Sequence, residues 1–149
     1  YTTKVLIEKP LQEVIKKINS FENLKHWHDG LVITEHISGT PGQFGSKLKL
    51  NYYYGKRKVE LIETITKHNL PSEIHVTYST KGMVNIQENY FETSENDFTY
   101  WVSKNDFQPT TFSMNAMLFL MPMTFRKQTK NYMTNFKRFV ENGTSLYNA

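Results

Sequence analysis

Residues 122–143 constrain the fold more than any other part of this 149-residue chain. Their large apolar side chains recur every three or four positions, and basic residues fill much of the gap between them. This spacing predicts one long amphipathic helix with a broad apolar face. We expect Phe125, Tyr132, Phe136 and Val140 to point toward the rest of the protein. Such a helix needs an apolar surface to cover, and the preceding residues must supply it.

Most of the chain before this helix alternates between apolar and polar residues, as β-strands with one buried face do. The clearest example is residues 45–54, where Leu48, Leu50, Tyr52 and Tyr54 share one face. Turn-forming residues separate these runs at short intervals, which favours a meandering antiparallel sheet. The exception is residues 10–26, where Pro10 opens a short helix and a second helical turn follows. A sheet wrapped around the C-terminal helix is therefore expected, with room for a hollow between them.

Length and composition limit the possible functions. The chain is long enough for a single domain, residues 1–149. It has no cysteine, which excludes disulfides, thiolate zinc sites and cysteine nucleophiles and is typical of a reducing, cytoplasmic setting. No run approaches the ~20 apolar residues of a membrane span, so stable membrane insertion is not expected. The first residues lack the features of a signal peptide, which also favours a cytoplasmic location.

The excess of positive charge is concentrated in the predicted helix. The formal net charge is +4, and residues 122–143 contain five basic residues and one acidic residue, Glu141. A nucleic-acid surface usually spreads basic residues over loops and sheet with aromatic residues between them. The pattern here is that of the solvated side of a packed helix. We therefore expect no nucleic-acid partner.

The sequence contains no recognisable motif for metal, phosphate or nucleophilic chemistry. His26 and His28 are two positions apart, which places them on opposite sides of a helix, so no metal site is predicted. No serine lies in a nucleophile-elbow sequence. Residues 39–45 are rich in glycine but lack the lysine and hydroxyl ending of a phosphate-binding loop. We assign no catalytic residue and expect no cofactor.

Two carboxylates are in phase with apolar residues of their predicted strands. Glu63 alternates with Leu61 and Ile65, and Glu88 alternates with Ile86 and Tyr90. A carboxyl group inside an apolar cavity has a raised pKa and can act as an acid or a base. The alternative is that each lies near a strand end, solvated or paired with a lysine. Tyrosines of the same strands either contact a ligand or fill the core.

The order of the predicted elements resembles that of the START-like (SRPBCC) superfamily, the polyketide cyclase/dehydrase and lipid-transport type of protein. The resemblance is carried by residues 7–14 (IEKPLQEV), Trp27, residues 39–46 (GTPGQFGS), residues 59–63 (VELIE) and residues 136–141 (FKRFVE). It implies an α+β helix-grip fold. In this fold a curved seven-stranded antiparallel sheet wraps around a long C-terminal helix, and a short helix pair follows the first strand. The superfamily shares no catalytic signature, so the resemblance implies no catalytic residue.

We expect this chain to bind a small hydrophobic or amphipathic ligand in a cavity between the sheet and the C-terminal helix. A lipid, a polyketide-like molecule or another aromatic or isoprenoid molecule fits this expectation. One alternative is a polyketide cyclase or dehydratase that uses a pocket carboxylate and tyrosines. Another is an interaction module, such as a chaperone cofactor, whose exposed surface at residues 112–123 contacts a partner protein or a membrane. The oligomeric state stays open.

The candidate ligand-binding residues are drawn from the expected concave face, the helix and the segment before it. They are Trp27, Leu48, Leu50, Tyr52, Tyr54, Glu63, Val76, Tyr78, Glu88, Tyr90, Tyr100, Met117, Met121, Phe125, Tyr132 and Phe136. The methionines lie in the apolar segment 112–123. Methionine adapts to irregular apolar shapes, so this segment is a candidate lid over the cavity. The alternative is that it is the first, kinked part of the final helix.

Overall fold

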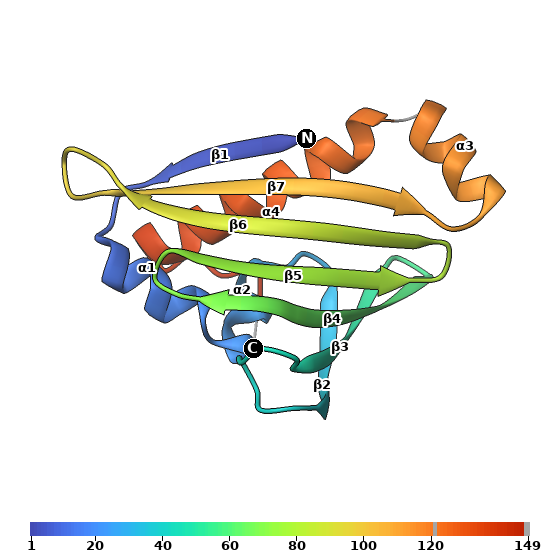
Figure 1. Ribbon diagram of the computed structural model, residues 1–149, viewed down its shortest axis with the longest axis horizontal. Helices are drawn as coiled ribbons and strands as arrows, with labels where there is room; N and C mark the ends of the chain where they lie inside the picture. Colours follow the sequence, from blue (N-terminus) through green and yellow to red (C-terminus); the bar gives the residue numbers. More distant parts are fainter. Residues whose placement is uncertain (121, 148–149) are drawn as a thin grey trace.

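A curved antiparallel sheet forms the body of the protein (Figure 1). The computed structural model describes residues 1–120 and 122–147. Within them, seven strands pair in the order β1-β7-β6-β5-β4-β3-β2. The strands are β1 (Thr2–Ile7), β2 (Leu31–Ser38), β3 (Lys47–Tyr54), β4 (Arg57–Asn69), β5 (Glu73–Thr80), β6 (Met83–Thr93) and β7 (Thr99–Pro109). Strands β2 to β7 form the predicted meander, and β1 pairs with β7.

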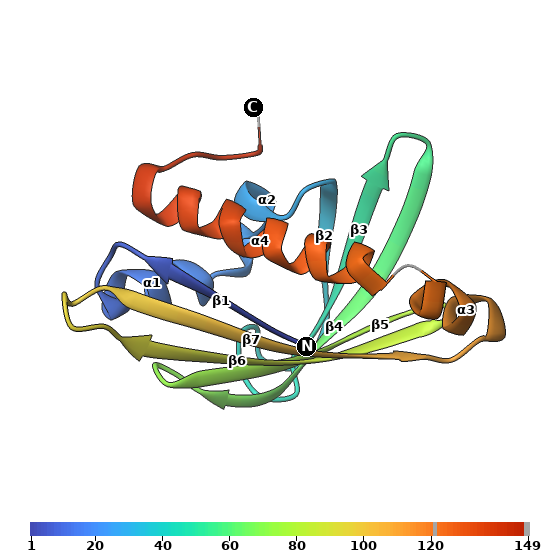
Figure 2. The same cartoon turned by 90° about the horizontal axis from the view of Figure 1, so that it is seen from above.

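Helices occur at two places in the chain. Between β1 and β2 lie α1 (Leu11–Ile18), the short 3-10 helix η1 (Phe21–Asn23) and α2 (Leu24–Trp27). After β7 come α3 (Phe112–Leu120) and the long helix α4 (Pro122–Asn142). Figure 2 shows α4 lying across the concave side of the curved sheet. The expected α+β helix-grip architecture is therefore confirmed.

Local sequence signals mark the ends of these helices. Pro10 precedes α1 with extended backbone angles, where its missing N–H costs no hydrogen bond. Gly143 follows α4 with φ of +70°, and its N–H donates to the carbonyl of Phe139 at 2.9 Å. A left-handed glycine in this position is a common helix terminator because it lacks a Cβ. The predicted bounds of the C-terminal helix are confirmed.

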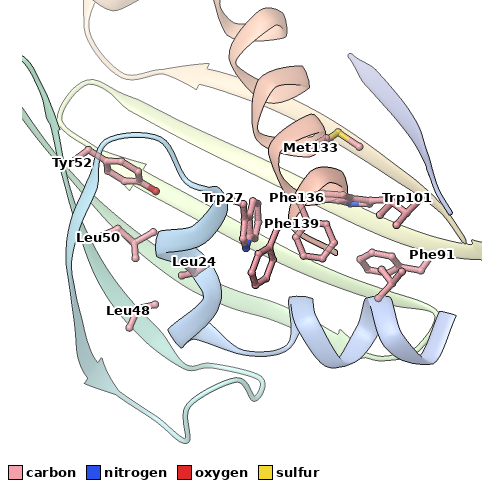
Figure 3. Close-up of a cluster of buried hydrophobic side chains, with 12 residues drawn as sticks. Leu24, Trp27, Leu48, Leu50, Tyr52, Phe91, Trp101, Met133, Phe136 and Phe139 are labelled. Carbon is pink, nitrogen blue, oxygen red and sulfur yellow. The ribbon is translucent and has the colours of Figure 1, made fainter. Parts of the chain in front are cut away.

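Aromatic side chains from three elements fill the space beneath α4 (Figure 3). Trp27 of α2 and Trp101 of β7 both contact Phe136 of α4, with ring centroids 5.0 and 5.3 Å apart. The two indole rings lie 6.0 Å apart, and all three pairs are edge-to-face, an arrangement that aromatic pairs favour. Phe136 is completely buried. The hollow expected directly beneath the helix is therefore occupied by the protein's own side chains.

The strand register decides which residues face the helix. Leu48 lies opposite Glu63, and Leu50 opposite Leu61, across β3 and β4. Glu63 in turn lies opposite Tyr78 of β5. Residues directly opposite each other in an antiparallel pair point to the same face, and Leu50 is completely buried in the core. Glu63 and Tyr78 therefore lie on the concave face, as their spacing predicted.

Strand β6 has the phase opposite to the one that its apolar residues suggest. Gln87 lies opposite Val76, so Gln87 faces inward. Side chains alternate along a strand, so Glu88 and Tyr90 of β6 point to the convex face. Tyr100 of β7 lies opposite Glu92 and shares that outer face. The expectation that Glu88, Tyr90 and Tyr100 share the concave face is wrong.

Hydrogen bonds between side chains explain why β6 turns its amides inward. Gln87 Nε2 donates to Asn105 Oδ1 at 2.9 Å, and Asn89 Nδ2 donates to Gln87 Oε1 at 3.0 Å. Trp101 Nε1 donates to Asn89 Oδ1 at 2.9 Å. Buried polar groups are tolerated when they bond to one another. This polar network makes inward-facing amides on β6 compatible with a buried surface.

A candidate ligand-binding cavity beside the C-terminal helix

A cavity of about 90 Å³ lies between the α1–α2 segment and the concave face of the sheet. Its walls come from α1, η1 and α2, from the loop between β2 and β3, and from strands β2 to β7. The lining residues are Ile18, Asn19, Phe21, Leu24, Trp27, His36, Pro41, Gly42, Ser46, Leu48, Glu63, Ile65, Ile74, Val76, Tyr78, Gln87, Asn89 and Trp101. Phe21 and Pro41 are exposed, so the cavity reaches solvent between η1 and the β2–β3 loop.

At this opening the β2–β3 loop contacts the end of α1 through Gly42. A Cβ placed on Gly42 would lie 3.8 Å from Asn19 Oδ1 and 3.9 Å from the Asn19 carbonyl oxygen. Gly42 also has φ of +78°, a conformation that residues with a Cβ seldom adopt. The turn predicted at residues 39–42 therefore places its backbone against the end of α1. Together these two segments form the rim of the cavity.

The cavity wall is apolar except for a few polar side chains. Gln87 and Asn89 are hydrogen-bonded within the sheet network. The indole N–H of Trp27, in contrast, is buried and has no hydrogen-bond partner among the described residues. A buried donor without a partner costs about 1–3 kcal/mol. Glu63 contributes a carboxyl group to the same cavity.

Burial controls the ionisation of Glu63. The group lies deep in the protein yet keeps some accessible surface because it borders the cavity. Loss of hydration raises the pKa of the Glu63 carboxyl, and the Tyr78 hydroxyl offsets part of that rise. Burial, followed by the nearby Glu63 charge, raises the pKa of Tyr78 well above its usual value. A carboxyl group with a raised pKa keeps its proton to higher pH than usual and can act as an acid or a base.

A second buried polar pair lies next to the cavity, outside its lining. His28 follows α2 and stacks on Tyr132 of α4 with ring centroids 4.9 Å apart. Its Nδ1 lies 2.7 Å from the Tyr52 hydroxyl. Burial lowers the pKa of His28 to about 3. His28 is therefore a neutral part of the core near pH 7.

The candidate residues from the sequence separate into groups. Trp27, Leu48, Glu63, Val76 and Tyr78 line the cavity. Other candidates on the concave side belong to the packed core or its edge. These are Leu50, Tyr52 and Phe136, which are buried, and Tyr54 and Tyr132, whose hydroxyl oxygens lie 3.1 Å apart. None of these five residues lines the cavity.

Two further candidates lie at the far end of the sheet. Phe125 packs against Phe107 with ring centroids 5.0 Å apart, and Met117 belongs to α3. Neither lines the cavity, whose walls include α1, η1 and α2 but no residue of α3. The idea that residues 112–123 form a lid over this cavity is therefore not supported. Met121 lies outside the described residues.

The remaining three candidates contact partners on the convex face. Tyr90 packs against His75 with ring centroids 5.3 Å apart, and Lys4 lies over the Tyr100 ring at 4.0 Å. Glu88 shares this face with them. The sequence pattern failed here because it assumed that the apolar residues of β6 and β7 mark the buried face.

Sequence reasoning missed the wall contributed by α1, η1 and the β2–β3 loop. Ile18 and Phe21 follow the opening of the first helix at helical apolar spacing, but nothing in that spacing distinguishes a cavity wall from ordinary core. Gln87, Asn89 and Trp101 were missed because the phase of β6 and β7 was misassigned. The glycine-rich turn was the available signal for a segment that approaches another backbone closely.

No group of three or more histidine, aspartate or glutamate side chains is arranged to hold a metal ion in residues 1–120 and 122–147. None of the helices in this part of the chain is both long enough and apolar enough to cross a bilayer.

No family model matches the sequence, and no curated protein matches it. Solved structures do resemble the fold. TTHA0849 from Thermus thermophilus is 13% identical with a TM-score of 0.76, over 97% of this chain and 98% of that one. Ara h 8.0201 is 10% identical with a TM-score of 0.71, over 94% of this chain and 95% of that one. The di-domain ARO/CYC StfQ from the steffimycin biosynthetic pathway is 11% identical with a TM-score of 0.73, over 96% of this chain and 45% of that one.

These similarities, at 10–13% identity, establish the fold. The chain has the helix-grip fold, and its resemblance to START-like proteins is confirmed at that level. What the cavity does must be argued from its own residues.

Proposed function

We propose that this protein binds a small amphipathic molecule in the cavity between the α1–α2 segment and the sheet. The observation that carries the proposal is the pairing of apolar walls with two buried polar groups, one of which has no hydrogen-bond partner among the described residues. These groups are the carboxyl of Glu63 and the indole N–H of Trp27. A ligand with an apolar body and a hydroxyl or carbonyl group would match both.

The size of the cavity restricts the ligand. Its volume of about 90 Å³ is below the roughly 300–1,000 Å³ of sites for drug-sized ligands. A small molecule that buries roughly 150 Å² of apolar surface gains about 4 kcal/mol before the cost of association. An acceptor that satisfies the Trp27 N–H recovers about 1–3 kcal/mol more. We therefore expect modest affinity and a strong dependence on a single polar group.

The protein carries its own reporter for this test. Its two tryptophans, Trp27 and Trp101, both line the cavity. Titration with octanol, an apolar chain with one hydroxyl, should change the tryptophan emission with saturation. Octane lacks the polar group and should bind more weakly. Octanoate should also bind more weakly because its charge would face the Glu63 carboxyl.

A matched pair of variants locates the binding. Val76→Phe fills the cavity, whereas Val84→Phe adds the same volume on the convex face of the neighbouring strand. Saturable binding should disappear in the first and persist in the second, with circular dichroism confirming that both fold. If Val76→Phe does not fold, Ile74→Phe serves the same purpose. A response that does not saturate, or that is equal in both variants, would contradict binding in this cavity.

A second candidate function is acid–base catalysis. It is favoured by the carboxyl of Glu63 lying opposite Tyr78 inside the cavity and by the fold similarity to StfQ, described as an ARO/CYC protein. In a β-hydroxy ketone, the Glu63 carboxylate would take the α-proton and return it to the departing hydroxyl, releasing water and leaving a carbon–carbon double bond. Tyr78 would hydrogen-bond to the carboxyl group during this transfer.

A phenyl-substituted β-hydroxy ketone tests this candidate because its dehydrated product absorbs in the near ultraviolet. Catalysed dehydration should be lost in Glu63→Gln and kept in Glu88→Gln, which changes a carboxylate on the convex face. No dehydration above the rate in buffer would argue against catalysis while leaving the binding proposal intact.

A further inference from the structure

Helix α3 presents large apolar side chains to solvent. Phe112 is 88% exposed, Phe119 83%, Leu120 74% and Met123, at the start of α4, 65%. Phe112 and Phe119 are seven positions apart, so they lie on the same side of the helix. The sequence of α3, FSMNAMLFL, has no charged residue. Neighbouring exposed apolar side chains of this size generally mark a contact with another molecule or a membrane.

The structure holds this helix at one end of the sheet. The N–H of Thr110 donates to the Gly82 carbonyl at 2.8 Å, which attaches the start of α3 to the β5–β6 turn. A Cβ on Gly82 would lie 3.0 Å from Thr111 Oγ1, so this contact is close. Figures 1 and 2 both show α3, the start of α4, the β5–β6 turn and the β3–β4 hairpin at the same end of the molecule. The cavity lies toward the other end.

Positive charge is concentrated at the same end. The β3–β4 hairpin contributes Lys56, Arg57 and Lys58, and the β5–β6 turn contributes Lys81. The first turns of α4 contribute Arg126, Lys127 and Lys130, and all seven side chains are exposed. No aspartate or glutamate occurs in the β3–β4 hairpin residues 51–59, in residues 78–87 around the β5–β6 turn, or in residues 107–130; Glu60, Glu88 and Asp106 are the acidic residues directly beside these segments. Eleven basic and fourteen acidic residues remain for the rest of the chain.

We propose that this end of the protein, with α3 at its centre, docks on the surface of an anionic lipid bilayer. The apolar side chains of α3 would enter the boundary between headgroups and acyl chains. The surrounding lysines and arginines would contact the lipid phosphates. A single membrane signal gives only marginal attachment and stable attachment takes two, and an apolar insertion next to a basic cluster supplies both. With nine residues, α3 is too short to span the bilayer and would lie in its surface.

The chemistry of the patch favours lipid over other partners. Phenylalanine, leucine and methionine side chains offer no hydrogen bond by which a protein partner could be oriented. A fluid acyl layer accepts such side chains without shape matching. A nucleic acid would pair with the basic residues but leave the apolar helix uncovered. The inference is independent of whether the cavity binds a ligand.

Flotation with lipid vesicles tests the proposal. We expect the full chain to float with vesicles of phosphatidylcholine containing roughly one third phosphatidylserine and to remain free with phosphatidylcholine alone. Each lysine near an anionic surface contributes about fivefold to partitioning, so Lys127→Gln/Lys130→Gln should weaken binding about tenfold or more. Phe112→Gln/Phe119→Gln should weaken it at least as much. Raising the salt from about 0.1 to 0.5 M should release the protein.

Matched controls change the same residue types elsewhere. Lys16→Gln/Lys25→Gln removes two exposed lysines of the α1–α2 segment, and Phe44→Gln removes an exposed phenylalanine of the β2–β3 loop. Both controls should bind vesicles as the unmodified chain does. All four substituted positions on α3 and α4 are exposed, so their variants should fold normally.

Several results would overturn the proposal. One is the absence of flotation with either kind of vesicle. A second is binding that the α3 and lysine variants leave unchanged. A third is self-association in size-exclusion chromatography with light scattering that Phe112→Gln/Phe119→Gln abolishes, without any vesicle binding. That last result would assign the patch to contact between copies of the chain.

Discussion

The ionisation of His28 should make the stability of this protein fall in mildly acidic solution. His28 is 5% exposed, with its ring stacked on Tyr132 and its Nδ1 bonded to the Tyr52 hydroxyl. Burial lowers its pKa to about 3, whereas the pKa of histidine in an unfolded chain is about 6.5. Between these two values the unfolded chain binds a proton that the native protein does not. The free energy of unfolding therefore decreases as the pH falls through this range.

The expected magnitude follows from the two pKa values. One extra proton bound by the unfolded state gives a slope of about 1.4 kcal/mol per pH unit. From about pH 7 to about pH 4.5 the loss attributable to His28 is roughly 2.5 kcal/mol. Glu63 works in the opposite direction, because its raised pKa favours the native state as it takes up a proton. His28 must therefore be isolated by substitution.

His28→Asn provides that isolation. An asparagine amide reaches the region of Nδ1, can keep the bond to Tyr52 and does not titrate. His28→Phe is the second variant, since it keeps an aromatic ring but leaves the Tyr52 hydroxyl without its partner. Urea unfolding followed by circular dichroism, repeated across the pH range, gives the free energy of unfolding of each protein. The difference between the unmodified chain and His28→Asn should shrink by roughly 2.5 kcal/mol on acidification.

The reasoning is refuted if that difference does not change with pH. It is also refuted if the imidazole proton resonances of His28 titrate near their usual pKa in the native protein. Either result would mean that the site admits a charged imidazole ring. The pH-dependent difference should be the same in His28→Phe, because only the loss of the titrating group is common to both variants.

Other substitutions probe the core, the cavity and the surface. Phe136→Ala should cost about 3–5 kcal/mol in urea unfolding, because it opens a hole where Trp27 and Trp101 meet; a much smaller loss would indicate a loosely packed centre. Glu63→Gln should become more stable relative to the unmodified chain as the pH rises through the raised pKa of that carboxyl, and equal pH profiles would contradict its burial. Lys67→Ala, which removes an ion pair between the exposed Lys67 and the largely covered Glu73, should change stability by about 1 kcal/mol or less, measured by thermal unfolding at two salt concentrations.

Much of the fold could be predicted because its signals are local. The apolar spacing of residues 122–143 and the glycine that follows position a helix without reference to the rest of the chain. The alternation in β3 and β4 correctly placed Leu48, Leu50 and Glu63 on one face, since apolar residues there do mark the buried side. Pro10 and the turn residues marked the boundaries of further elements.

The phase of β6 could not be predicted in the same way. Its inward-facing Gln87 and Asn89 are compatible with burial only because Asn105 and Trp101 of β7 bond to them. Those partners lie more than ten positions away in the chain, and the strand register alone brings them opposite. When only neighbouring residues are considered, such amides are assigned to the solvent-exposed face. The prediction therefore placed Glu88 and Tyr90 on the wrong face.

The sequence by itself determined the class of architecture and the position of its long helix. Helical periodicity and turns both depend on residues that are close together in the chain. The tertiary structure decided where the cavity lies. Three aromatic rings from α2, β7 and α4 meet beneath the helix and fill the space expected for a ligand. The remaining hollow lies where the α1–α2 segment and the β2–β3 loop meet the sheet. The position of this hollow depends on how side chains from elements far apart in the sequence fill the interior. A local sequence pattern carries no information about that packing.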